Sequence, residues 1–241
     1  MARNLLLAGG PPSHDFAALA QTSAAALRRD GIETAIVDNV DAFVDLLSDH
    51  DHRPDLITVF TLRFTMTHPR YDDVRERWAE ATTERTRQAI SSYVASGGGL
   101  LAIHTACVCF DDWAGWGVLL GASWDWEQSS HEPVGDAVID PAGHPHPITH
   151  EVESFTVTDE IYESLAVRSE TKTLLSCERA GAAQPVLWAR SHGDGRVVVD
   201  TLGHSTESLN LAAHDLVLRR SAQWVLGASD SAVRALNPKE N

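Results

Sequence analysis

Two histidines stand directly behind short apolar segments, in similar sequence contexts. His104 closes the segment GGGLLAIH at residues 97–104, and His204 follows the segment GRVVVDTL at residues 195–202. An imidazole can give or take a proton near neutral pH, and either ring nitrogen can bind a metal. For a single histidine of this kind, a structural core or cap role is the alternative. Two of them, each at the end of an apolar segment, favour a functional site.

A pair of adjacent carboxylates, Asp159 and Glu160, lies in the segment TDEIY at the end of another strand-like stretch. Neighbouring residues of a strand point to opposite faces, so only one of the two can face a common pocket. That carboxylate could orient a histidine and raise its basicity, or it could act as the acid or base itself. A solvated strand end is the alternative, and the sequence does not decide which carboxylate faces inward.

A third histidine-rich stretch, GHPHPITH at residues 143–150, spaces its imidazoles two residues apart. Its prolines keep the backbone extended, so alternate side chains share a face. The stretch could therefore hold a metal pair, but no third ligand stands at a definable spacing. A proline-stiffened structural turn is the alternative.

Cys107 and Cys109 follow His104 closely, yet we expect both to be small packing residues. Their spacing is neither that of a CxxC redox motif nor that of a zinc ribbon, and His104 itself occupies the turn where a nucleophile would sit. The sequence also contains no phosphate-binding P-loop, no GxGxxG after the first strand and no GxSxG elbow. Nucleotide-dependent chemistry and serine hydrolysis are therefore disfavoured, and no nucleotide cofactor is expected.

The first hundred residues show alternating strand and helix patterns, and these elements must form the scaffold that positions the candidate groups. We expect strands at 4–9, 33–38, 55–60 and 100–104, with helices from a cap at Ser13 to about residue 29, at 41–49 and at 71–96. Strands that are apolar on both faces predict a parallel sheet covered by helices on both sides. Ligands of such sheets bind beyond the carboxyl ends of the strands. His104 and the loops at 9–15 and 61–68 belong to that edge.

The second half of the chain is richer in strands. We expect strands at 134–140, 154–160, 171–178, 184–191 and 195–202, with a tight hairpin at HGDG between the last two. A helix over about 209–226 then closes the fold. A single domain over residues 1–227 and a polar tail over residues 228–241 follow from this pattern.

The composition limits the partners. The 241 residues carry a net charge of −15, and a field of that sign opposes binding to nucleic acid or to an anionic membrane but not to a neutral sugar. No apolar run is long enough for a signal peptide or a membrane helix. A cytoplasmic protein with reduced thiols is expected, and a homo-oligomer is left open.

Six segments, in this order, resemble the trehalose-utilisation (ThuA-like) family: GGPPSHDF, GGGLLAIHTA, LLGASW, GHPHPITHEVESFTVTDEIYES, PVLWARSHGDGRVVVDTLGHS and RRSAQWVLGA. The resemblance covers about residues 3–227. It implies a flavodoxin-like α/β fold similar to class I glutamine amidotransferases, which is a three-layer sandwich with a mostly parallel central sheet and extra strands in the C-terminal half. Amidotransferases carry a nucleophilic cysteine where this chain has His104, so the resemblance also implies that glutaminase activity is absent.

The resemblance further implies carbohydrate metabolism, with a keto-disaccharide such as a trehalose derivative as substrate. A neutral histidine near pH 7 is suited to moving a proton beside a ketone, as an isomerase or epimerase would require. The implied catalytic residues are His104, Asp159, Glu160 and His204. The candidate substrate-binding residues are His14, Asp15, His131, Trp124 and Trp126. Indole faces suit the C–H face of a pyranose, which also makes Trp113 and Trp116 candidates. Ser123 and Trp124 depart from the family's usual pattern.

Two other functions stay open at this point. The chain could be a non-catalytic sugar-binding or partner subunit that keeps an amidotransferase-like scaffold. It could also be a metal-dependent hydrolase, for which the candidate ligands of a divalent metal such as zinc are His104, His131, Glu160 and His204.

Overall fold

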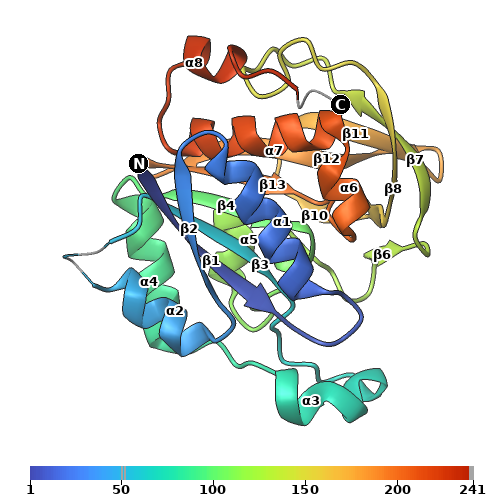
Figure 1. The fold of residues 1–241 in the computed structure, drawn as a ribbon. Coiled ribbons are helices and arrows are strands. Elements are labelled where there is room, and N and C mark those ends of the chain that lie inside the picture. The colour runs from blue at the N-terminus through green and yellow to red at the C-terminus, as the bar shows by residue number, and fades with distance from the viewer. Residues whose placement is uncertain (50, 52, 239–241) are drawn as a thin grey trace.

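A nine-stranded sheet forms the middle layer of the fold (Figure 1). The computed structural model describes residues 1–49, 51 and 53–238. The strands lie in the order β2 (Ile32–Val37), β1 (Ala2–Gly9), β3 (Leu56–Thr61), β4 (Gly99–Ile103), β13 (Gly195–Asp200), β12 (Ala182–His192), β11 (Lys172–Arg179), β7 (Gly135–Pro141) and β8 (Phe155–Asp159). The first five are parallel and the last four are antiparallel to their neighbours. The expected mostly parallel sheet with extra C-terminal strands is confirmed.

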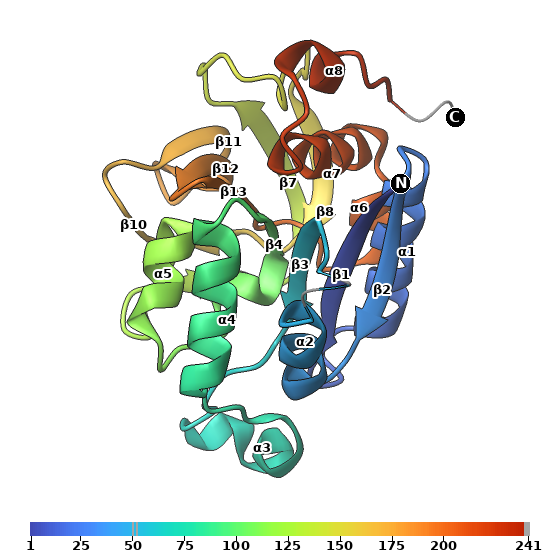
Figure 2. The ribbon, with the colours of Figure 1, turned by 90° about the vertical axis from the view of Figure 1, so that its left-hand side faces the viewer.

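Helices cover both faces of the parallel part (Figure 2). On one face lie α1 (Phe16–Arg28), α6 (Thr206–Asn210) and α7 (Ala212–Val225), which pack with inward residues such as Leu6 and Val198. On the other lie α2 (Val40–Leu47), α4 (Glu84–Ala95) and α5 (Ala114–Leu120), which pack with Leu7 and Val199. Successive strand residues thus enter two separate cores, which is why the parallel strands read as continuous apolar runs.

Two of the predicted helix boundaries were wrong. Asp15, not Ser13, caps α1, because its carboxylate accepts a hydrogen bond from the Ala18 backbone N–H. The predicted helix over 71–96 is two helices, α3 (Asp72–Trp78) and α4. The chain becomes extended at Ala79, and Thr83 starts the second helix by capping the Thr86 N–H. The intervening Thr82 N–H is bound by the Asp112 carboxylate instead of a helical carbonyl.

The predicted helix over 209–226 is also divided, at Leu211, whose ψ of 128° is extended. Helix α6 ends there and α7 begins. This break turns Ser208 towards the sheet edge, where it contacts Asp159 and His214.

The residues after α7 fold back onto the domain. Val233, in α8 (Asp230–Arg234), is fully buried, and the Arg220 guanidinium donates to the backbone carbonyls of Arg234 and Leu236. Residues 239–241 of the predicted polar tail lie outside the described residues.

Short elements surround the carboxyl edge of the sheet. They are η1 (Pro69–Tyr71), α3, the 3₁₀ turn η2 (His104–Cys107), and the two-residue strands β5 (Ala122–Ser123), β6 (Ser130–His131), β9 (Tyr162–Glu163) and β10 (Ala166–Val167). In the described part of the chain, no helix combines the length and apolar character that crossing a bilayer requires.

Candidate functional site

Four strands deliver polar side chains to one edge of the sheet. His14 follows β1, His104 follows β4, His204 follows β13, and Glu160 follows β8. The strand β8 lies four places from β13, but the antiparallel alternation points its C-terminal end in the same direction. Strand β7 pairs with β11 at only two positions, so the β7–β8 ribbon is free to bend back towards the loop after β13.

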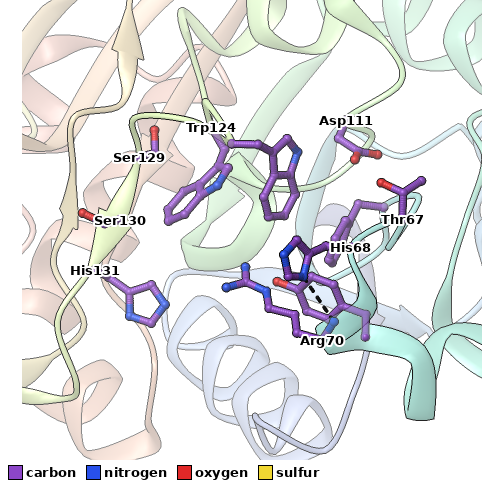
Figure 3. A pocket seen from close by; sticks show the side chains of 11 residues that line it. Thr67, His68, Arg70, Asp111, Trp124, Ser129, Ser130 and His131 are labelled. Carbon is purple, nitrogen blue, oxygen red and sulfur yellow. Dashed lines mark hydrogen bonds between the residues drawn. The ribbon is translucent and has the colours of Figure 1, made fainter.

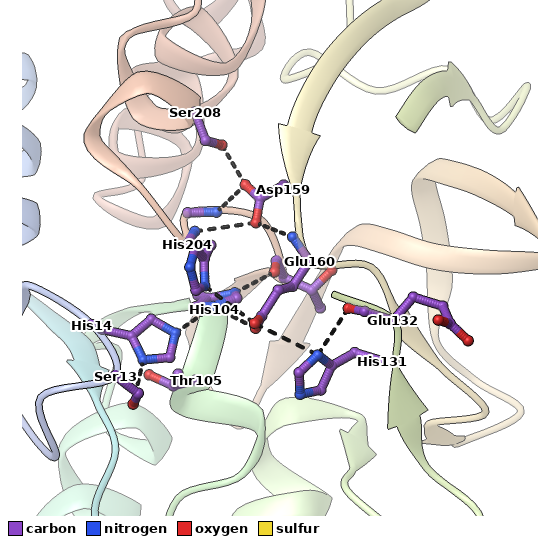
Figure 4. Close-up of polar contacts among 12 residues, drawn as sticks. Ser13, His14, His104, Thr105, His131, Glu132, Asp159, Glu160, His204 and Ser208 are labelled. Atoms are coloured by element: carbon purple, nitrogen blue, oxygen red, sulfur yellow. Dashed lines mark hydrogen bonds and ion pairs between the residues drawn. The ribbon is translucent and has the colours of Figure 1, made fainter. Parts of the chain in front are cut away.

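The four side chains converge on one small volume (Figure 4). One ligand atom from each of His14, His104, Glu160 and His204 lies within 4.8 Å of the other three. His14 Nε2 and His104 Nε2 are 3.1 Å apart. Glu160 Oε2 lies 3.6 Å from His104 Nε2, and Glu160 Oε1 lies 3.4 Å from His204 Nδ1. We call these four residues the His/Glu cluster.

His104 sits at a sharp turn in an uncommon backbone conformation. Its φ is +50°, in the left-handed region that residues other than glycine seldom adopt. The ring is completely buried, and Nδ1 lies 2.9 Å from the Thr201 carbonyl oxygen, so Nδ1–H donates to that carbonyl. This tautomer leaves the Nε2 lone pair directed at the cluster. Backbone strain of this kind persists where the surrounding structure fixes it, and it is concentrated at functional sites.

His14 completes a continuous hydrogen-bond chain. Ser13 Oγ lies 3.0 Å from His14 Nδ1, and His14 Nε2 contacts His104 Nε2. Because the His104 Nε2 must accept, His14 Nε2–H donates, and the Ser13 hydroxyl donates to His14 Nδ1. Burial and the neighbouring His104 and His204 lower the pKa of His14 to about 3. His14 is therefore neutral at physiological pH.

The adjacent carboxylates have separate tasks, as the alternation of strand side chains requires. Glu160 faces the cluster, whereas Asp159 is buried on the opposite side. Asp159 accepts hydrogen bonds from the backbone N–H groups of Gly203 at 2.8 Å and His204 at 3.1 Å. It also accepts from the Glu160 N–H at 2.8 Å and from the Ser208 hydroxyl. Asp159 thus fixes the backbone that carries both His204 and Glu160.

A buried polar network continues behind Asp159. Ser208 Oγ lies 3.1 Å from His214 Nδ1, and His214 Nε2 lies 3.1 Å from Asp200 Oδ2. His214 Nδ1 also lies 2.9 Å from the Ser208 carbonyl oxygen, which can only accept. Both ring nitrogens therefore face acceptors, which favours the doubly protonated imidazolium. Burial opposes this charge, but the Asp200 carboxylate and the hydrogen bonds raise the pKa of His214 overall.

Charge within the His/Glu cluster is unevenly distributed. Burial would raise the pKa of Glu160, but His204, His104 and His131 lower it to about 2. The Glu160 carboxylate raises the pKa of His204, while burial lowers that of His104. At neutral pH the cluster therefore offers the Glu160 carboxylate and the neutral imidazoles of His14 and His104, whereas the raised pKa of His204 favours its protonated form. Carboxylates and imidazoles are groups that bind a metal or transfer a proton.

The donor set fits a divalent cation such as zinc. Ligands about 2.0–2.1 Å from a tetrahedral zinc lie roughly 3.3 Å from one another, close to the separations observed here. Among the described residues, His204 Nδ1 is buried and makes no aligned hydrogen bond, although Glu160 Oε1 lies 3.4 Å away, so its lone pair is available to an ion. The Ser13 hydroxyl and the Thr201 carbonyl each contact the ring nitrogen of His14 or His104 that faces away from the cluster, as polar groups commonly do for metal-binding imidazoles.

A profile of the family described as ThuA, trehalose utilisation, matches residues 35–225. The chain belongs to the ThuA family. Among solved structures, it resembles a ThuA-like protein from Parabacteroides merdae ATCC 43184, with a TM-score of 0.74 and 16% identity over 94% of this chain and 91% of the other. It also resembles a ThuA-like protein from Bacteroides uniformis ATCC 8492, with a TM-score of 0.69 and 16% identity over 93% of this chain and 91% of the other. No curated protein matches the chain in sequence.

A more distant likeness concerns the fold alone. A β-galactosidase from Halorubrum lacusprofundi gives a TM-score of 0.58 at 14% identity, over 95% of this ThuA chain and 31% of that enzyme. The match to ThuA-like structures confirms the flavodoxin-like fold expected from the sequence.

The other predicted site residues of this ThuA protein lie around the cluster. His131 Nδ1 is 3.6 Å from Glu160 Oε1, and the His131 ring is exposed. Trp124 and Trp126 line a cavity that also reaches His131 (Figure 3). The Asp15 carboxylate is engaged in capping α1 and has no contact with the cluster.

Several other candidates lie outside the cluster. Trp116 is buried, with its indole N–H donated to the Ala106 carbonyl, and Trp113 packs against it. His146 packs on Trp224, so the GHPHPITH stretch is not joined to the cluster. Cys107 and Cys109 are buried, and burial raises the pKa of Cys109 to about 12.

Sequence reasoning did not single out several supporting residues. Tyr162 stacks on His104 with ring centroids 5.1 Å apart, and Asp200, Ser208 and His214 form the buried network. A charged residue at the end of the apolar strand GRVVVD was the available signal for Asp200. Ser208 precedes the predicted helix over 209–226 and His214 lies within it, and helix patterning does not show which residues lie against β8.

Proposed function

We propose that this ThuA protein is an enzyme of carbohydrate catabolism that moves a proton beside the keto group of an oxidised disaccharide, such as a trehalose derivative. The observation that carries the proposal is the convergence of His14, His104, His204 and Glu160 at one sheet edge. The family description, trehalose utilisation, supports a disaccharide substrate. A cytoplasmic location is part of the same proposal.

The His/Glu cluster would hold a divalent metal through its three imidazoles and one carboxylate. When bound, such an ion acts as a Lewis acid that polarises a carbonyl oxygen, which makes an adjacent C–H more acidic. The chain's own contribution is to present one carboxylate and three imidazoles, and a proton held by His204 would be released when the ion binds.

His131 is the group best suited to carry the proton. It lies outside the four-ligand set, is exposed, and its Nδ1 is 3.6 Å from Glu160 Oε1. A neutral imidazole can accept a proton from the carbon beside the keto group and later return it to that carbon or to an adjacent atom of the substrate. Glu160, ionised throughout this range, would steady the charged imidazolium. Asp159 keeps Glu160 and His204 in place through its backbone hydrogen bonds.

The test is proton exchange measured in D₂O. Protein purified without added metal is analysed for metal content, then mixed with keto-trehalose and zinc or manganese, and the C–H signals beside the keto group are followed by proton NMR. We expect those signals to disappear in step with metal loading. The His131→Asn variant should slow exchange by at least about 100-fold, as expected when a positioned acid–base group is lost, and Glu160→Gln should slow it by a similar factor because a ligand of the ion is lost. Asp136→Asn, an exposed carboxylate on β7, is the control and should match the wild type.

The alternatives give different results in this assay. A metal-dependent hydrolase would release reducing sugar, and a non-catalytic binding subunit would give a saturable thermal shift with no exchange and no product. Either result, or exchange that persists unchanged in both variants, would overturn the proposal.

A further inference from the structure

A cavity of about 520 Å³ adjoins the His/Glu cluster (Figure 3). His131 belongs to its wall and links it to Glu160. Trp124 links it to His104 through Tyr162, since the Trp124 and Tyr162 rings lie 5.3 Å apart and Tyr162 stacks on His104. The four cluster residues do not line the cavity themselves, so His131 and Trp124 are the wall residues that connect a bound ligand with the cluster.

One wall of the cavity is aromatic. Phe64 and Trp126 stack with centroids 5.2 Å apart, and Trp124 meets Trp126 edge-on at 6.1 Å. The Trp126 side chain is 43% exposed, which is unusual for an indole and leaves a ring face open to a ligand. Such a face binds the apolar side of another ring.

Arg70 supplies a charge at the other side of the cavity. Its guanidinium carbon lies 4.6 Å from the Tyr71 ring centroid and 5.8 Å from that of Trp126. Within the described part of the chain, the Arg70 guanidinium has no carboxylate within ion-pair distance and donates no hydrogen bond, although the protein as a whole is strongly acidic. Figure 3 shows the guanidinium extended into the cavity.

The one carboxylate in the wall does not neutralise Arg70. Asp111 accepts from the Thr65 backbone N–H and from the Thr65 hydroxyl, both at 2.8 Å. Stacking on Tyr71 holds the guanidinium plane while leaving its N–H edge free, which is the geometry that recognises a carboxylate or phosphate.

We propose that this cavity binds a sugar ring that carries a carboxylate or a phosphate, with the ring against Trp126 and the anionic group on Arg70. The inference deepens the proposed function, since the cavity would select the acidic substituent of the substrate whose keto group lies at the cluster. Arg70 and Trp126 are then specificity-determining residues.

The test is isothermal titration calorimetry at low salt in EDTA, where no metal occupies the cluster. The probes are glucuronate, glucose 6-phosphate, glucose and inorganic phosphate. We expect one of the two acidic sugars to bind at least about 10-fold more tightly than glucose, the factor expected for one charge-assisted pair. Arg70→Gln should remove that preference, and Trp126→Ala should weaken the binding of both acidic sugars.

Arg77→Gln is the matched control, because Arg77 is an exposed arginine stacked on Trp78 in the same segment but outside the cavity wall. It should change no affinity by more than about 2-fold. The comparison of glucuronate with glucose 6-phosphate identifies the anionic group. Equal affinity for glucose, unchanged preference in Arg70→Gln, or equally tight binding of inorganic phosphate would overturn the proposal. Calorimetry measures binding without turnover, so a failure of the proposed keto-sugar chemistry does not affect this result. A failure to bind acidic sugars likewise leaves the proton-exchange test unaffected.

Discussion

Replacing Asp159 with Asn tests whether this buried carboxylate holds the site together. The carboxylate accepts four hydrogen bonds, from the N–H groups of Glu160, Gly203 and His204 and from the Ser208 hydroxyl. An amide nitrogen in place of Oδ2 cannot accept from the Gly203 N–H, which leaves a buried donor unsatisfied at a cost of about 1–3 kcal/mol. The remaining bonds lose their charge assistance, which is worth roughly half of their strength.

The free energy of unfolding of Asp159→Asn should therefore fall by about 2–4 kcal/mol, measured by urea denaturation. For a domain of this size, this lowers Tm by roughly 10 °C. Because Asp159 positions His204 and Glu160, zinc affinity measured by chelator competition should fall about 10–100-fold, as is typical when a group that holds metal ligands in place is lost.

Asp136→Asn is the matched control on the neighbouring strand. Asp136 is exposed, and its carboxylate accepts a hydrogen bond from the Thr158 hydroxyl but from no buried backbone N–H among the described residues. Its unfolding free energy should change by less than about 0.5 kcal/mol. An Asp159→Asn protein as stable as this control, with wild-type zinc affinity, would refute the positioning role.

Three further predictions follow from the same structure. His104→Asn and His104→Ala should both lose zinc binding. The Asn variant should have a free energy of unfolding in urea about 1 kcal/mol higher than the Ala variant, because asparagine tolerates the φ of +50° better than alanine. A more stable alanine variant would contradict the proposed backbone strain. Native protein should resist alkylation by iodoacetamide at pH 8 at all three buried cysteines and react at all three in urea, and rapid labelling of Cys109 in the native state would show that its thiol is accessible. The raised pKa of His214 means that its imidazolium stabilises the fold below about pH 6.5 and that this contribution is lost as pH rises through the raised value. The difference in unfolding free energy between wild type and His214→Gln should therefore shrink from pH 6 to pH 9. A difference that widens would contradict the pairing of His214 with Asp200 and, through Ser208, with Asp159.

Much of the fold is visible in the sequence because the parallel strands are apolar on both faces and end at glycines or polar residues. The strand predictions for β1, β3 and β4 lie within two residues of the observed bounds. The helix predictions failed where a side chain competes with the helix for backbone donors. Asp112 binds the N–H of Thr82, and no local pattern shows that a carboxylate thirty residues away will do so.

The site was predictable as a set of strand-end residues but not as a geometry. His104 and His204 follow parallel neighbouring strands, so their proximity follows from topology. The place of Glu160 depends on the bend of the β7–β8 ribbon, which strand patterning does not encode. Arg70 lies in a segment without apolar periodicity, and only its position over Tyr71 and Trp126 in three dimensions gives it a role.

The bend of the β7–β8 ribbon has a consequence for how the protein matures. Its return to the loop after β13 means that the four residues of the His/Glu cluster, spread from residue 14 to residue 204, meet only when sheet assembly is complete. Contacts so distant along the chain form late and slowly. A nascent or truncated chain therefore lacks the assembled His/Glu cluster, and an ion bound there would stabilise the finished fold without guiding its formation.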